Sequence, residues 1–199
     1  GFTRAPVIAE VGTAAVSDQP LTIALSHSFA DPVVFAAATT TNGWQPATVR
    51  VQSLTSDTLT LAMQEPLSLD GTHAAEQVSW MVVEAGSWQL ADGTRLEVGT
   101  TTVSARGGAG MTDVTFAAAF DAVPLTLAQV QELPSDDFLD TRQTGASATG
   151  FRVTLEAEEA RNALVQPPQE VGWMAIDPGT GLWEGQEGLI TFEAGTTGP

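Results

Sequence analysis

Apolar and polar residues alternate in short runs along the whole chain, which predicts β-strands separated by tight turns. The alternation is clearest over residues 58–63, where Leu59, Leu61 and Met63 occupy every second position and therefore one face of a strand. Asp, Gly, Pro and Ser separate these runs, and helical spacing is hard to find. Because half-buried strands need a second sheet over their apolar face, we expect an all-β fold of packed sheets.

One stretch of sequence occurs twice. Residues 77–86 return almost intact as residues 170–179, with Trp80 and Trp173 separated by 93 residues. Internal repetition of this kind defines the architecture and takes priority over single-element assignments. We therefore predict two tandem six-stranded antiparallel β-sandwich domains, over residues 1–94 and 95–199.

A shorter motif marks the start of each copy. The Glu-Val-Gly-Thr sequence at residues 10–13 recurs at 97–100, and a third version, Glu-Ala-Gly-Thr, lies at 193–196. We interpret the third version as the start of another copy or as a closing strand. The expected strands are 6–16, 20–26, 32–38, 48–53, 58–64 and 77–84 in the first copy, and 101–104, 113–118, 124–130, 140–144, 151–156 and 170–177 in the second.

Two loops in each copy differ in length or composition. The longest connection covers residues 65–76 in the first copy and 157–169 in the second, where residues 158–164 also suit a short helical turn. The glycine-rich run at 107–110 aligns with a hairpin turn of the first copy, so we place it inside the second domain and not in a linker.

The net charge of the chain excludes some classes of binding partner. The chain has 24 Asp and Glu residues but only 7 basic residues, all Arg, which gives a formal net charge of −17. Nucleic acid and anionic membrane surfaces would repel such a chain, and no apolar run is long enough to span a bilayer. An acidic surface suits salty surroundings, divalent cations or neutral ligands such as sugars. Cysteine is absent, which excludes disulfides and thiolate chemistry.

The repeated residues resemble a known family. Each copy has an early Phe followed by Pro, at Phe29 and Pro32 or at Phe120 and Pro124, and a closing Val-x-Trp-Met strand. This pattern resembles the H-type lectin domain, and the segment around residues 69–73 is similar to tandem modules of large secreted proteins of marine bacteria. The resemblance implies six-stranded antiparallel sandwiches, binding of N-acetylgalactosamine-type sugars, and assembly into trimers. It matches no sugar-contacting residue here, and the closing-strand Trp residues are expected to pack in the core.

The first copy holds one candidate ligand platform. Trp44 lies in a polar turn, between Asn42 and Gln45, where a large indole has little local core to join. Its ring would stack on the apolar face of a sugar while Asn42 supplies hydrogen bonds. Alternatively, the ring folds back over the end of the sandwich. In the second copy the sequence of this loop differs, so we do not expect the same site there.

Two further groups of polar residues are candidates for binding a ligand or calcium. Asp70 and His73 lie in the long loop of the first copy, as contacts for a ligand or calcium or as an ordinary Asp-Gly turn with a solvated His. Asp136, Asp137 and Asp140 place three carboxylates within five residues, enough oxygens for Ca²⁺ but without the spacing of an EF-hand. Solvated, mutually repelling carboxylates are the other interpretation.

Two arginines at equivalent positions in the two copies are the last candidate site residues. Arg50 and Arg142 align between the copies and suit either a structural ion pair, with Glu65 or Glu156, or a fork that binds a ligand or neighbouring subunit. Phe138 and Arg142 join Asp136 and Asp137 as weaker candidates in the second copy.

The predicted function follows from these residues. No nucleophile elbow, zinc pattern or phosphate-binding loop is present, so we do not expect an enzyme. We predict a secreted or cell-surface carbohydrate-binding module involved in cell adhesion, able to form homo-oligomers or part of a longer multidomain chain. The alternative is a structural repeat of an adhesin stalk or filament, in which the strands near Glu10 or Glu193 pair with a neighbour.

Overall fold

The structure of the chain is a computed structural model that describes residues 7–104, 110–131, 137–158, 168–185 and 188–195. Within these residues every regular element is a β-strand, which confirms the all-β prediction. The helical turn expected within residues 158–164 falls almost wholly outside the described residues, as does most of the glycine-rich run at 107–110.

The first six strands form one two-layer unit, here called the first unit. Two antiparallel three-stranded sheets, in the orders β1-β6-β3 and β2-β5-β4, contribute to one buried cluster that includes Val34, Leu61 and Trp80. A shared cluster means that the sheets pack face to face, as alternating strands require. The strands are β1 (Ala9–Val16), β2 (Leu21–Ala24), β3 (Pro32–Ala38), β4 (Thr48–Leu54), β5 (Thr58–Gln64) and β6 (Glu76–Glu84).

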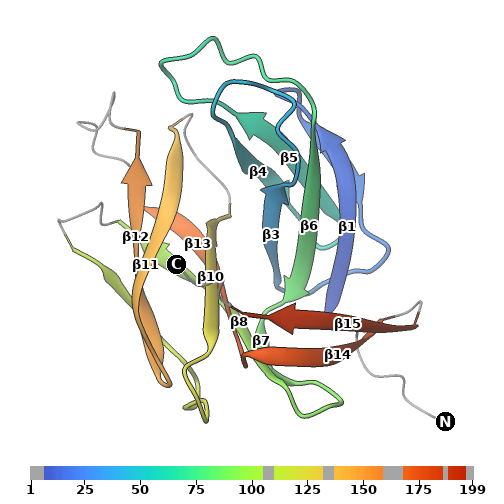
Figure 1. Cartoon of the computed structure of the whole chain (residues 1–199), viewed down its shortest axis with the longest axis vertical. Helices are drawn as coiled ribbons and strands as arrows, with labels where there is room; N and C mark the ends of the chain where they lie inside the picture. Colours follow the sequence, from blue (N-terminus) through green and yellow to red (C-terminus); the bar gives the residue numbers. More distant parts are fainter. Residues whose placement is uncertain (1–6, 105–109, 132–136, 159–167, 186–187, 196–199) are drawn as a thin grey trace.

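The next seven strands form the second unit. Its sheets have the orders β10-β13-β8-β7 and β11-β12-β9, and their common core includes Phe116, Phe151 and Trp173. The strands are β7 (Gly86–Gln89), β8 (Arg95–Val103), β9 (Thr112–Thr115), β10 (Leu125–Val130), β11 (Leu139–Ser147), β12 (Gly150–Ala157) and β13 (Gln169–Ile176). The sequence pattern missed β7 and placed the start of β8 too late. A further hairpin, β14 (Gly179–Gly185) with β15 (Gly188–Ala194), lies below the first unit and beside β7 and β8 in Figure 1.

The repeated tryptophans hold the same place in both units. Trp80 on β6 pairs in register with Gly12 on β1, and Trp173 on β13 pairs with Gly99 on β8. Both indoles are buried, which confirms their expected packing role. Each ring lies directly against its glycine, and a Cβ at Gly99 would come within 2.8 Å of the Trp173 ring. The glycine of the Glu-x-Gly-Thr motif is therefore required by the tryptophan opposite it.

The two units share a third apolar cluster. Outward-facing side chains of β3, including Val33 and Phe35, pack with Leu96 and Val98 of β8 and Met174 of β13. Sheet β1-β6-β3 of the first unit and sheet β10-β13-β8-β7 of the second therefore lie together, as Figure 1 shows. Each of these sheets has both faces at least partly buried. Burial of these apolar side chains stabilises the contact between the two units.

Two glutamine side chains cover the edge of β3. The amide of Gln131 accepts from the Val34 N–H at 2.9 Å and donates to the Val34 carbonyl at 3.0 Å. The amide of Gln129 makes the same pair with Ala36, at 2.7 and 3.1 Å. A side-chain amide has the donor and acceptor of a peptide group, so these two residues take the place of a neighbouring strand.

Candidate functional site

The long loop of the first unit is built around a buried histidine. His73 is 5% exposed, and its Nδ1 and Nε2 lie 3.0 Å from Glu65 and 3.3 Å from Glu76. The His73 backbone N–H also donates to Asp18 at 3.2 Å. The solvated His of one sequence interpretation is wrong, because His73 is buried between these two carboxylates, while its proposed part in ligand or calcium binding remains a prediction. His73 fixes the loop and does not line its outer surface.

The carboxylate of Glu76 connects this loop to the turn that carries Trp44. It accepts hydrogen bonds from the backbone N–H of Asn42 and of Gly43, each at 2.7 Å, and from the Thr40 hydroxyl at 2.5 Å. These donors hold the pKa of Glu76 at about 2, well below its ordinary value of 4.5. Gly43 packs against the His73 ring with no room for a Cβ. The turn is therefore fixed from inside the protein.

This pKa shift predicts a pH-dependent stability. A carboxylate whose folded pKa is lowered stabilises the fold above its unfolded pKa, and that stability is lost as pH falls through the folded pKa. We expect the stability advantage of the wild type over Glu76→Gln to decline as pH falls from 4.5 towards 2. Urea unfolding of both proteins across this range measures the difference. A difference that stays constant with pH would contradict the assigned role.

Trp44 stands on this fixed turn and points into solvent. Its side chain is 90% exposed, so the interpretation in which the ring covers the end of the sandwich is wrong. Asn42, its expected partner in ligand binding, instead donates its side-chain amide to the Ala75 carbonyl at 2.8 Å. The indole is thus exposed on a turn that part-buried hydrogen bonds hold in place, and its apolar faces are open to a ligand.

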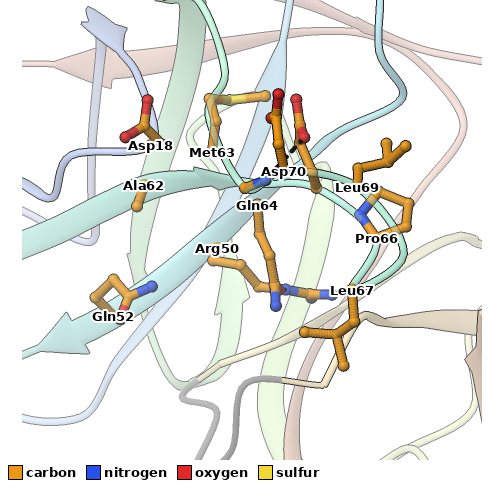
Figure 2. A pocket seen from close by; sticks show the side chains of 12 residues that line it. Asp18, Arg50, Gln52, Ala62, Met63, Gln64, Pro66, Leu67, Leu69 and Asp70 are labelled. Atoms are coloured by element: carbon orange, nitrogen blue, oxygen red, sulfur yellow. Dashed lines mark hydrogen bonds between the residues drawn. The ribbon is translucent and has the colours of Figure 1, made fainter. Parts of the chain in front are cut away.

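A cavity of about 390 Å³ opens beside the same loop (Figure 2). Its floor is the outer face of β4 and β5, with Arg50, Gln52 and Gln64, and its rim is the loop from Glu65 to Gly71. Asp70 lies on this rim and accepts the Thr72 N–H at 3.0 Å, which makes the Asp-Gly turn that the sequence suggested. Amide, carboxylate and guanidinium groups around a cavity of this size suit a polar ligand with several hydroxyl groups.

Arg50 is the most unusual residue of the cavity. It is 5% exposed, its Nε donates to the Gln64 side chain, and its Nη2 makes no hydrogen bond. Burial lowers the pKa of Arg50 to about 10, and Asp140 of the second unit partly opposes this shift. The guanidinium also lies 5.5 Å from the centre of the Phe138 ring. Arg50 therefore contacts the second unit, and neither Glu65 nor Glu156 forms the ion pair that the sequence allowed.

The equivalent arginine of the second unit has a different setting. Arg142 is exposed and pairs with Glu156 at 2.5 Å, which is the structural ion pair that the sequence offered as one alternative. Glu156 occupies the position of the neutral Gln64 and supplies the carboxylate of this pair. Exposed pairs of this kind contribute little to stability.

The acidic cluster of the second unit is only partly described. Asp136 lies outside the described residues, so the proposed calcium triad with Asp137 and Asp140 remains a prediction. Asp140 is exposed and accepts the N–H of Thr141 at 2.7 Å. Among the residues that the structure does describe, no three His, Asp or Glu side chains are grouped to hold a metal ion.

Sequence comparison gives one relative of interest. The chain is 28% identical over 187 residues to halomucin of Haloquadratum walsbyi (strain DSM 16790 / HBSQ001). The aligned part is 89% of this chain but 2% of halomucin, so the chain spans a very small share of that protein. No family model matches the chain, and no solved structure does. In the described part of the chain, no helix is long and apolar enough to cross a membrane.

Proposed function

We propose that this chain is a rigid repeat segment of a much larger extracellular or cell-surface protein. The observation that carries the proposal is the contact between the units, in which a shared apolar cluster and the amides of Gln129 and Gln131 join them. Flexibly linked binding domains do not need such a contact, whereas a stalk that transmits force or sets distance does.

The likeness to halomucin supports this proposal. A match that covers most of this chain and so little of halomucin fits a segment within a long protein. The net charge of −17 fits a protein that stays soluble and separated in concentrated salt. We further propose that each unit has the H-type lectin-like sandwich fold that its sequence resembles.

Rigidity between the units is directly measurable. Residual dipolar couplings of the whole chain in a weakly aligned medium should fit one alignment tensor for the strands of both units. We expect ¹⁵N relaxation to give one rotational correlation time for the two units. Separate tensors, or two correlation times, would show independent domains and overturn the proposed stalk function.

A second function is supported by Trp44. We propose that the first unit also binds carbohydrate, with the exposed indole stacking on a sugar ring and the Arg50 cavity receiving a second group of the same glycan. The support is the 90% exposure of Trp44 on a turn fixed by Glu76, together with the hydrogen-bonding groups of the cavity. In this arrangement Asp70 would accept hydrogen bonds from hydroxyl groups of the glycan, and Gln52 would donate hydrogen bonds to them.

Glycan binding has a simple test. On a broad glycan array, with and without calcium, we expect the wild type to bind a subset of sugars and to show quenching of Trp fluorescence in solution. The Trp44→Ala variant should lose both signals, and Trp44→Phe should keep weaker binding because a smaller ring still stacks. Binding that needs calcium would support the Asp136, Asp137 and Asp140 site. Absence of any response in the wild type would remove this second function.

A further inference from the structure

The hairpin β14–β15 repeats the hairpin β7–β8 in register and conformation. Gly86 pairs with Val98 in β7–β8, and Gly179 pairs with Ala194 in β14–β15. Both glycines have positive φ, 141° and 133°, a region that side-chain-bearing residues rarely adopt. The same backbone conformation therefore begins β7 and β14. Strand β15 thus corresponds to β8 and, through the shared Glu-x-Gly-Thr motif, to β1.

One face of β15 packs against the rest of the protein. Phe192 and Ala194 pack against the apolar cluster shared by the two units, as do Leu96 and Val98 at the corresponding positions of β8. This contact orients the strand, so β15 presents its other face and its free edge in a fixed direction. Among the described residues, β15 pairs with β14 alone, whereas β8 pairs with both β7 and β13.

Among the described residues, no indole lies against Gly195. The corresponding Gly12 and Gly99 each lie against the tryptophan of a closing strand, Trp80 or Trp173. A Cβ at Gly195 would meet nothing within 4 Å. The seat for a tryptophan is therefore present in the third copy of the motif, and it is open.

Glu193 also differs from the glutamates at the corresponding positions of β1 and β8. The corresponding Glu10 accepts the N–H groups of Ser26 and His27, and Glu97 accepts the N–H of Ala117 at 2.7 Å. These donors lie in the segment that follows β2 in the first unit and β9 in the second. Glu193 is exposed instead. Two positions that are occupied in both complete units are thus open at β15.

We propose that the free edge of β15 binds the closing strand of a further module of the same kind, antiparallel and with its tryptophan opposite Gly195. By analogy with β1–β6 and β8–β13, Ala194 would face the methionine that follows this tryptophan, and Phe192 would face the apolar residue two positions further on. Continuity with the shared apolar cluster favours this occupant over an unrelated peptide. The inference rests on the proposed repeat function and specifies how one segment joins the next.

The test uses the whole chain, labelled with ¹⁵N, and a peptide that copies residues 169–177. We expect saturable shifts of the amide signals of residues 192–195, and none with a peptide in which the tryptophan is replaced by alanine. A second arm joins the same strand to the chain through a flexible Gly/Ser linker, which raises its effective concentration to about the millimolar range. In that arm we expect the β15 amides to exchange with solvent at least tenfold more slowly.

Substitutions of glycine supply matched controls. Gly195→Val should leave the unfolding midpoint of the free chain unchanged, because its Cβ meets nothing, and should abolish both the shifts and the slowed exchange. Gly12→Val introduces the same side chain beneath Trp80 and should lower the midpoint.

The outcomes separate the two proposals. Shifts at β1 or β8 in place of β15, or no response of the wild type in either arm, would overturn the strand-binding proposal. The alignment tensor measured on the same samples reports independently on the repeat function. A single tensor with an unresponsive β15 would leave that function standing and reject this inference alone.

Discussion

Replacing Trp173 with alanine is expected to lower the free energy of unfolding by about 3–5 kcal/mol, the usual cost of removing a large aromatic side chain from a core. Trp173 is 8% exposed and lies 6.0 Å from the Phe116 ring and 6.2 Å from the Phe151 ring, between centroids. Its indole also covers Gly99, which has no side chain to fill the space left behind. The cavity would therefore open between both sheets of the second unit.

The same substitution at Trp44 is the matched control. Because Trp44 is 90% exposed, we expect Trp44→Ala to change the unfolding free energy by less than about 0.5 kcal/mol. Urea unfolding followed by far-UV circular dichroism measures both variants without relying on tryptophan fluorescence. Equal costs for the two substitutions would mean that Trp173 is not a core residue of the second unit.

Sequence alternation located most of the strands because each strand buries one face. Leu59, Leu61 and Met63 fill the core of the first unit as their spacing indicates, and Phe151, Val153 and Leu155 do the same in the second. The hairpin strand β7 escaped prediction because it is four residues long and follows β6 almost directly. A strand that short gives no alternation to count.

The candidate site was harder to predict, because its residues depend on contacts between distant segments. Nothing near His73 in the sequence shows that Glu65 and Glu76 enclose its ring, since either carboxylate is equally compatible with solvent. Arg50 and Arg142 occupy equivalent positions, yet only Arg50 is covered by the other unit. One signal was available: Glu76 directly precedes the repeated closing strand, and an acidic residue at the start of an apolar strand is unusual.

Differences between the copies, more than their similarities, mark the contact between the units. Gln129 and Gln131 correspond to Ala37 and Thr39 of the first copy, and Gly172 corresponds to Ser79. In the structure Gln131 and Val33 lie against Gly172, where a Cβ would overlap both. Only the second unit receives the edge of β3, so only its copy needs two amides and a glycine there. Sequence repetition alone cannot distinguish such substitutions from neutral drift.

Removing the Gln131 amide is expected to lower the stability by an amount similar to the loss of the Trp173 side chain. In Gln131→Ala, the N–H and the carbonyl of Val34 would lose their partners at a residue that is 0% exposed. Each buried group left without a partner costs about 1–3 kcal/mol, so we expect a total loss of about 2–6 kcal/mol unless water enters. The exposed Gln143 gives a matched control, and Gln143→Ala should be nearly neutral.

Hydrogen exchange distinguishes loss of the contact from general destabilisation. If Gln131 holds the edge of β3, the Val34 amide should exchange faster in Gln131→Ala by a larger factor than the amides of β12, which lie far from the contact. The alignment tensors of the two units should also diverge, because the amide pairs fix one unit against the other. Unchanged protection of Val34 in the variant would mean that another group covers this edge. The apolar cluster alone would then account for the rigidity of the repeat, since it joins the same two sheets without any directional bond.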